Sequence, residues 1–144
     1  MRKNLGIEGL GDLVERPIVA TLATYRQDGS VLLSPVWHEW RDGGFNVIVG
    51  GADVKARQLR RDLRASIAVY ESDPPYRGIE LRATARLSTA GTHEVWRRIA
   101  IRYLGPEAGA AYAGEPAGEG EDLLVRLEPG DLRTWDFADD AWDG

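Results

Sequence analysis

The chain has 144 residues, which suits one globular domain, and we expect a single domain over residues 1–144. It has no cysteine and two histidines, which excludes disulfide scaffolds, thiolate metal sites, cysteine nucleophiles and histidine-rich metal centres. Acidic side chains outnumber basic ones by 23 to 18, and no apolar run approaches the roughly 20 residues that span a bilayer. The N-terminus lacks the apolar core of a signal peptide, so we expect a cytoplasmic protein that binds neither nucleic acid nor membrane.

The first third of the chain predicts a short helix and a hairpin. The helix is expected over residues 7–14 and is stopped by Pro17. A β-branched run over 18–24 predicts a strand, and the Asp28-Gly29 pair predicts a hairpin turn. We expect the returning strand over 31–40, with Pro35 inside it; because proline cannot donate a ladder hydrogen bond, Pro35 marks an edge, a bulge or a ligand-facing stretch.

The middle of the chain predicts a strand over 45–49 and then a short helix. Asp53 is a plausible N-cap for this helix, which is expected over 54–61. Two further strands follow, over 65–71 and over 79–87, where apolar and polar residues alternate.

The last third changes to a helical period over 92–104, with Thr92 as a possible cap and Gly105-Pro106 as a stop. We then expect, in order, a weaker helix over 107–112, a mobile loop over 113–122, strands over 123–127 and 132–137, and an acidic tail anchored by Trp142. About seven strands, several joined by tight turns, predict a mainly β fold with inserted helices, either a small barrel or a sandwich.

Nothing in the sequence resembles a nucleophilic triad, and no Gly-x-Ser-x-Gly motif occurs. His38 is expected on a sheet face or at the surface rather than in a site, and His93 is expected to be solvated. The carboxylates are spread over a loop and the tail, so acid–base catalysis by a carboxylate pair is not expected, and neither is a metal site.

One segment is strongly basic, although the chain as a whole is acidic. Residues 55–64 hold five cations and one anion and begin just after Gly50, Gly51 and Asp53. Because the first amides of a helix have no internal partner, this junction with Lys55 is a candidate anion site. An ordinary exposed basic helix face explains the segment equally well. Tryptophans at 37 and 40 indicate core or interface, or the wall of a planar ligand site.

Several motifs, taken in order, carry a resemblance to a known family. They are Ala20-Thr21-Leu22-Ala23-Thr24, Asp28-Gly29, Ser34-Pro35-Val36-Trp37, the run from Lys55 to Asp62, Pro75-Tyr76-Arg77, and Arg133-Thr134-Trp135-Asp136-Phe137. The chain resembles the pyridoxamine-phosphate-oxidase-like flavoproteins, and more narrowly the small actinobacterial branch that uses the deazaflavin coenzyme F420.

The resemblance implies an FMN-binding split β-barrel that forms a homodimer with flavin-type sites at the interface. It places Lys55 at the cofactor phosphate, with Arg57 and Gln58 assisting at the phosphate or the tail. The ring system would be lined by Ser34, Pro35, Val36 and Trp37. Gly50 and Gly51 would offer backbone amides where relatives often carry a hydroxyl, and Tyr76 and Arg77 would reach the site from the second subunit.

The resemblance therefore predicts an F420-dependent oxidoreductase that transfers hydride from the reduced deazaflavin to an unsaturated small molecule. The cofactor performs the chemistry, so no catalytic side chain is assigned. Arginines at 57, 60, 61 and 64 favour F420 over FMN, because its oligoglutamate tail offers carboxylates to bind. Two alternatives remain: an FMN-dependent enzyme, and a non-catalytic protein that binds a flavin or a haem-type ligand.

Overall fold

The structure is a computed structural model that describes residues 1–116 and 122–140, so part of the expected loop and Trp142 lie outside the described residues. The strands are β1 (Arg2–Lys3), β2 (Ala20–Tyr25), β3 (Val31–Val36), β4 (Glu39–Arg41), β5 (Gly44–Gly50), β6 (Arg64–Tyr70), β7 (Gly78–Thr84), β8 (Arg86–Ser88), β9 (Asp122–Leu127) and β10 (Asp131–Asp136). The helices are α1 (Val54–Arg61), α2 (Thr92–Leu104) and α3 (Pro106–Ala113), preceded by 3-10 turns η1 (Ile7–Leu10) and η2 (Leu13–Glu15).

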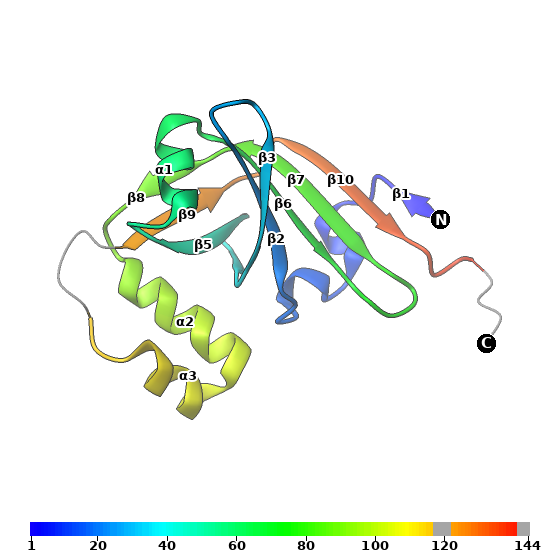
Figure 1. Cartoon of the computed structure of the whole chain (residues 1–144). Helices are drawn as coiled ribbons and strands as arrows, with labels where there is room; N and C mark the ends of the chain where they lie inside the picture. Colours follow the sequence, from blue (N-terminus) through cyan, green and yellow to red (C-terminus); the bar gives the residue numbers. More distant parts are fainter. Residues whose placement is uncertain (117–121, 141–144) are drawn as a thin grey trace.

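The strands form two antiparallel sheets that pack against each other (Figure 1). One has the order β1-β10-β7-β6-β2-β3, and the other has the order β4-β5-β9-β8. The buried core between them includes Leu22, Phe45, Ile67, Leu81 and Val125, each with an exposed fraction of 0%. The predicted mainly β fold with inserted helices is therefore confirmed. Within the described residues, no helix has the length and apolar character that crossing a bilayer requires.

Two of the predicted strands are each divided between the sheets. The predicted strand over 31–40 becomes β3 and β4, with Trp37 and His38 between them, and the strand over 79–87 becomes β7 and β8, with a break at Ala85. The amide of Ala85 still donates to the carbonyl of Leu63 at 2.6 Å, in the register of the β6–β7 ladder, and the chain then passes to the other sheet, where Arg86 pairs with Arg126. The alternation of apolar and polar residues continues through Ala85, and residues 31–40 contain no glycine or turn pair, so the sequence predicted one strand in each case.

The predicted helices are closer to the structure than the predicted strands. α1 has the expected bounds, and Asp53 is its N-cap, because Asp53 Oδ1 accepts a hydrogen bond from the Lys55 amide at 2.9 Å. α2 also has the expected bounds, but its N-cap is Gly91 with φ of 70°, so the prediction that Thr92 caps it is wrong. The predicted N-terminal helix is replaced by the two 3-10 turns, since Gly11, with φ of 63°, ends the first of them.

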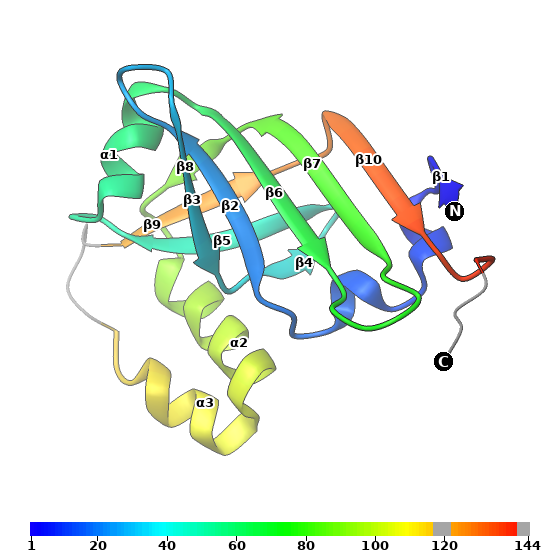
Figure 2. The ribbon, with the colours of Figure 1, turned by 45° about the vertical axis from the view of Figure 1, so that its right-hand side comes forward.

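The α2–α3 hairpin is inserted between β8 and β9 and lies at one end of the sheets (Figures 1 and 2). α3 packs against α2, and Gly109 lies at their closest approach. A Cβ atom at position 109 would lie 2.3 Å from the Cα of Ile101, which is too close for any side chain. Glycine at this position therefore sets the separation of the two helices.

His38 lies at the crossover between the sheets, where it is fully buried rather than at the surface. Its Nε2 lies 3.0 Å from the carbonyl oxygen of Ile18, and since a carbonyl only accepts, Nε2 carries the proton. Nδ1 then has no hydrogen-bond partner in the described part of the chain. Burial, together with the nearby charge of Arg102, lowers the pKa of His38 to about 4, so the ring is neutral.

The buried neutral His38 predicts a pH-dependent stability. Its pKa is about 4 in the folded chain and 6.5 ordinarily, so below pH 6.5 the unfolded chain takes up a proton that the folded chain does not. We expect the free energy of unfolding to fall by about 2 kcal/mol between about pH 7 and about pH 5 through this group. Chemical denaturation across this range measures it. His38→Gln keeps a donor for Ile18 and should lose this slope, and parallel profiles for the two proteins would contradict the assignment.

The close approach at Gly109 predicts that Gly109→Ala displaces α3. The added methyl meets the backbone of α2, so we expect a loss of about 1–3 kcal/mol in stability, typical of overpacking. Near-UV circular dichroism and hydrogen exchange of α3 report the displacement. Ala108→Ser, at an exposed position of the same helix, is the control and should behave as wild type. Equal stability of Gly109→Ala and wild type would show that the helices are not in tight contact.

Candidate functional site

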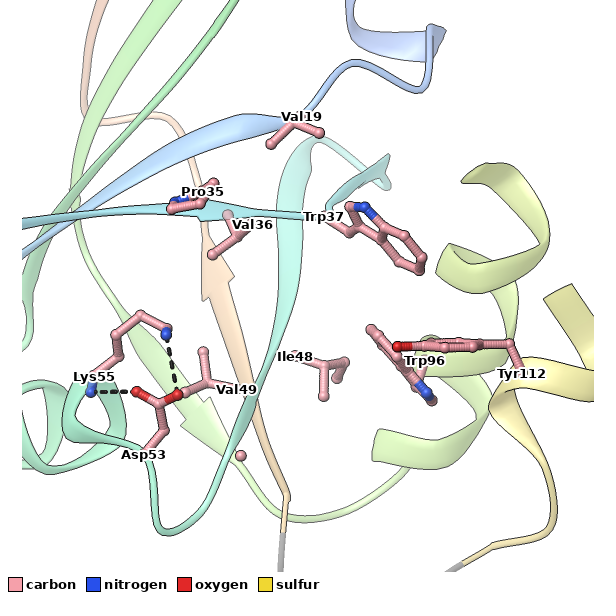
Figure 3. A pocket seen from close by; sticks show the side chains of 11 residues that line it. Val19, Pro35, Val36, Trp37, Ile48, Val49, Asp53, Lys55, Trp96 and Tyr112 are labelled. Carbon is pink, nitrogen blue, oxygen red and sulfur yellow. Dashed lines mark hydrogen bonds and ion pairs between the residues drawn. The ribbon is translucent and has the colours of Figure 1, made fainter. Parts of the chain in front are cut away.

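A cavity of about 440 Å³ opens where β3, β5, the start of α1 and the α2–α3 hairpin meet (Figure 3). Two of its residues are charged, one is a glycine, and the others are aliphatic or aromatic. The lining residues are Val19, Pro35, Val36, Trp37, Ile48, Val49, Gly50, Asp53, Lys55, Trp96 and Tyr112. The cavity is thus an apolar pocket with its charged groups gathered at one end.

The charged end is built by the turn that leads into α1. Lys55 Nζ lies 3.1 Å from Asp53 Oδ2, and the other carboxylate oxygen accepts from the Lys55 amide. The hydrogen bond from this amide is the largest influence that lowers the pKa of Asp53, followed in the same direction by the Lys55 side chain. Asp53 is therefore ionised at neutral pH, and the backbone amide of Lys55 is already engaged.

The glycines beside this turn leave open space. Gly50 ends β5 and lines the cavity, and a Cβ built on it meets no atom within 4 Å. The carbonyl of Gly51 accepts a hydrogen bond from Arg60 at 3.0 Å, which holds that guanidinium close to the charged end. A phosphate-sized group has room at Gly50 and two cations near it.

The opposite end of the cavity is aromatic. Trp37 stacks on Tyr103 with ring centroids 4.8 Å apart and planes 6° apart, and on Trp96 with centroids 5.7 Å apart. Tyr112 from α3 lies 5.8 Å from Trp37 and 5.9 Å from Trp96, with tilted planes. In Figure 3 Trp37, Trp96 and Tyr112 lie together on the side away from Lys55. Stacked indole and phenol rings of this kind suit a flat conjugated ligand.

Hydrogen bonds to α2 hold the aromatic wall in place. The hydroxyl of Tyr103 donates to the carbonyl of Ile18 at 2.8 Å and accepts from the backbone amide of His38 at 3.2 Å. Burial raises the pKa of Tyr103, so its hydroxyl keeps the proton it donates. Arg102 donates to the carbonyl of His38 at 2.6 Å. These bonds fix the backbone next to Trp37 and the ring beneath it.

The structure brings five of the residues expected at the site into this cavity, namely Pro35, Val36, Trp37, Gly50 and Lys55. Gly51 is the next residue along the chain from Gly50. As expected from its lack of an amide hydrogen, Pro35 lies on β3, an edge strand of its sheet, and it faces the cavity.

Other expected site residues lie elsewhere in the chain. Ser34 alternates with Pro35 and is buried, while Gln58 is buried with its Oε1 accepting from Thr24 at 2.6 Å. Arg57 is exposed on α1. Tyr76 and Arg77 both lie in the loop between β6 and β7, and neither lines the cavity of its own chain.

Arg77 is held in an ion cluster of its own. It pairs with Glu71 and with Asp12, and it donates to the carbonyl of Leu10 at 2.7 Å. Arg16 pairs with the same Glu71 at 2.6 Å. The guanidinium of Arg77 thus joins the N-terminal turns to the barrel.

Sequence reasoning missed Val19, Ile48, Val49, Trp96 and Tyr112 as lining residues and treated Asp53 only as a cap. Trp96 lies within the helix expected over 92–104, but nothing in the hydrophobic pattern shows that α3 folds back on α2. Among the described residues, no group of three or more histidines and carboxylates could hold a metal ion. The cavity therefore has the chemistry of a binding site for an organic ligand with one flat apolar part and one anionic part.

Comparison with known proteins agrees with the fold. The profile of pyridoxamine 5'-phosphate oxidase matches residues 8–136, and no curated protein matches the chain. The conserved hypothetical protein Rv2991 from Mycobacterium tuberculosis superposes with a TM-score of 0.77 at 24% identity, covering 93% of this chain and 86% of that one.

Two further structures share the fold at lower similarity. An F420 reductase has a TM-score of 0.68 at 22% identity, covering 84% of this chain and 93% of that one. The heme storage protein HutZ from Vibrio cholerae has a TM-score of 0.64 at 18% identity, covering 88% and 92%. With its paired antiparallel sheets, its inserted helices and a family profile that spans most of its length, the chain belongs to the pyridoxamine 5'-phosphate oxidase family and has the split-barrel fold.

Proposed function

We propose that this protein is an oxidoreductase that uses F420 to reduce an unsaturated small molecule. One observation carries the proposal: a single cavity joins an aromatic wall at Trp37 to an ammonium group at Lys55. A deazaflavin has a flat tricyclic ring, a ribityl chain and a phosphate, in that order. The two ends of the cavity match the two ends of such a molecule.

Each group of lining residues has a role in the proposed complex with the cofactor. Lys55 would hold the phosphate by a charge-assisted contact, and Val36, Val49 and Pro35 would pack along the apolar part. Trp37 and Trp96 would orient the ring and exclude water beside it. When bound in its reduced form, the deazaflavin supplies the hydride. Asp53 is ionised at neutral pH and holds no proton to give, so a proton that the acceptor needs would come from solvent or from the hydroxyl of Tyr112, which also lines the cavity.

Arginines near the charged end support F420 over FMN. Arg60 lies against the carbonyl of Gly51, and Arg57 is exposed on the same helix, its guanidinium making no hydrogen bond or ion pair to the described residues. Both are placed where a polyanionic tail leaving the Lys55 end would meet them. Arg61 and Arg64 are engaged elsewhere, with the Tyr25 carbonyl and with Asp62. FMN, which lacks the tail, remains the alternative for the same cavity.

We also propose a homodimer whose interface borders the cavity. In Figure 2 the six-stranded sheet presents an outer face that no helix crosses within the described residues. Leu33 on edge strand β3 is 66% exposed, and Val19 before β2 is 52% exposed. Since Val19 and Pro35 also line the cavity, a second copy on this face would close its open side. From that copy, Tyr76 in the β6–β7 loop would be the candidate contact. The guanidinium of Arg77 is held by Glu71 of its own chain.

The role of Lys55 predicts weaker cofactor binding in Lys55→Ala. We expect an affinity loss of roughly 1.5–3 kcal/mol for F420, the range of a contact with a charged group. Fluorescence titration of the protein, purified from a host that makes no F420, measures it. Arg41→Ala, exposed on β4, is the control and should bind as wild type does. Unchanged affinity in Lys55→Ala would reject the assigned role.

Turnover and colour separate the candidate functions. With reduced F420 and a panel of enones and quinones, we expect oxidation of the cofactor that depends on both protein and acceptor. A yellow protein as purified would favour FMN, and a Soret band would favour a haem-type ligand. Stable binding of F420 without turnover by any acceptor would instead favour a cofactor carrier.

The exposed apolar face predicts a dimer that Leu33→Glu disrupts. Wild type should elute with twice the chain mass of 15.9 kDa, because burying Leu33 and Val19 against a second copy removes apolar surface from water. A charge at position 33 should give the monomer. Light scattering with size-exclusion chromatography measures both. Leu104→Glu, at an exposed position at the end of α2, should leave the dimer intact, and a monomeric wild type would overturn this part of the proposal.

A further inference from the structure

The cavity contains its own anion. Of the residues that line it, Asp53 and Lys55 carry charge, and they face each other across 3.1 Å. The Lys55 side chain is only 19% exposed, whereas Asp53 is 36% exposed and lies at the open side of the pair. The formal charge of the lining is therefore zero, although it includes the lysine expected to hold a phosphate.

The Asp53 carboxylate engages both kinds of donor that an anion would use at this turn. One oxygen accepts from the backbone amide of Lys55, and the other accepts from its ammonium group. The backbone amide of Asp53 itself donates to the carbonyl of Gly50 at 2.9 Å. An incoming phosphate must therefore share Lys55 with Asp53 or displace it.

Sharing has an electrostatic cost that the rest of the chain does not offset. A phosphate and a carboxylate on the same ammonium are like charges a few ångströms apart, and their repulsion opposes binding. The formal net charge of the chain is −5, so its long-range field does not attract anions either.

We propose that Asp53 is a specificity-determining residue. By competing for Lys55, it lowers the affinity of this pocket for the phosphate of its cofactor. This inference rests on the proposed function and deepens it. The aromatic wall then supplies most of the affinity for the ring, and the phosphate contributes less than it would at an unpaired Lys55. The cofactor is held as a ligand that exchanges readily, because the charge of Lys55 is already balanced by Asp53.

The test uses variants that remove the negative charge of Asp53 and keep its N-cap hydrogen bond to the Lys55 amide. Asn accepts the hydrogen bond from the Lys55 amide as Asp does, so Asp53→Asn leaves α1 capped while freeing the ammonium. Asp53→Ser is a second capping variant without charge. Asp62→Asn removes the same charge from the other end of the same helix and is the matched control.

Two ligand pairs separate the contribution of the anionic part from that of the ring, and the second pair isolates the phosphate. F420 is compared with its riboflavin-like fragment, which lacks phosphate and tail, and FMN is compared with riboflavin, which differs by the phosphate alone. Dissociation constants are measured by fluorescence titration at low and high salt. In Asp53→Asn we expect F420 or FMN to bind about tenfold more tightly, about 1.4 kcal/mol, with the phosphate-free partner unchanged. This gain in affinity should be smaller in high salt. It should vanish when Asp53→Asn is introduced into Lys55→Ala, compared with Lys55→Ala alone.

The outcomes separate the inference from the proposed function. If wild type binds a phosphorylated ligand and neither capping variant binds it more tightly, the inference fails and the function stands. An equal gain for the phosphate-free partner, or the same gain in Asp62→Asn, also overturns the inference. If folded wild type and Asp53→Asn bind none of the four ligands, the proposed function fails together with the inference.

Discussion

Side chains from one turn of α2 tie the crossover between β3 and β4 to the segment that precedes β2. Arg102 donates to the carbonyls of Val14, Arg16 and His38, and the hydroxyl of Tyr103 donates to the carbonyl of Ile18. Buried backbone carbonyls need such partners where strand pairing stops, so the fold relies on this turn at the crossover. The same turn places the ring of Tyr103 beneath Trp37, and the binding cavity therefore depends on it too.

Local signals in the sequence were sufficient for part of the fold. An Asp before a basic helical stretch predicted α1 and its cap, and the apolar period of 3.6 predicted both ends of α2. The division of two long strands between the sheets could not be predicted, because the alternation of buried and exposed residues continues through Ala85 and no glycine or turn pair marks the crossover at His38. At His38 the crossover is held by tertiary hydrogen bonds between its backbone and the side chains of Tyr103 and Arg102.

The sequence predicted the residues at the charged end of the candidate site better than those at its aromatic end. Lys55, Gly50 and Pro35 follow from a strand–turn–helix junction and an edge proline, which are local features. Tyr112 follows from the packing of α3 on α2, which depends on the absence of a side chain at Gly109 and has no signature in the hydrophobic pattern. Gln58 was expected to face the ligand, but a polar side chain on a helix can equally turn inward, here to Thr24.

The two ends of the cavity are built by separate parts of the chain, and the α2–α3 hairpin builds one of them. Strand ladders and α1 build the anionic-ligand end, whereas an insertion between β8 and β9 supplies Trp96 and Tyr112. α3 rests on α2, so residues of α3 can change while the strand pairing is kept. Under the proposed function, such a chain can acquire a new acceptor preference during evolution by remodelling a peripheral appendage, while the inherited barrel keeps its part of the proposed cofactor site.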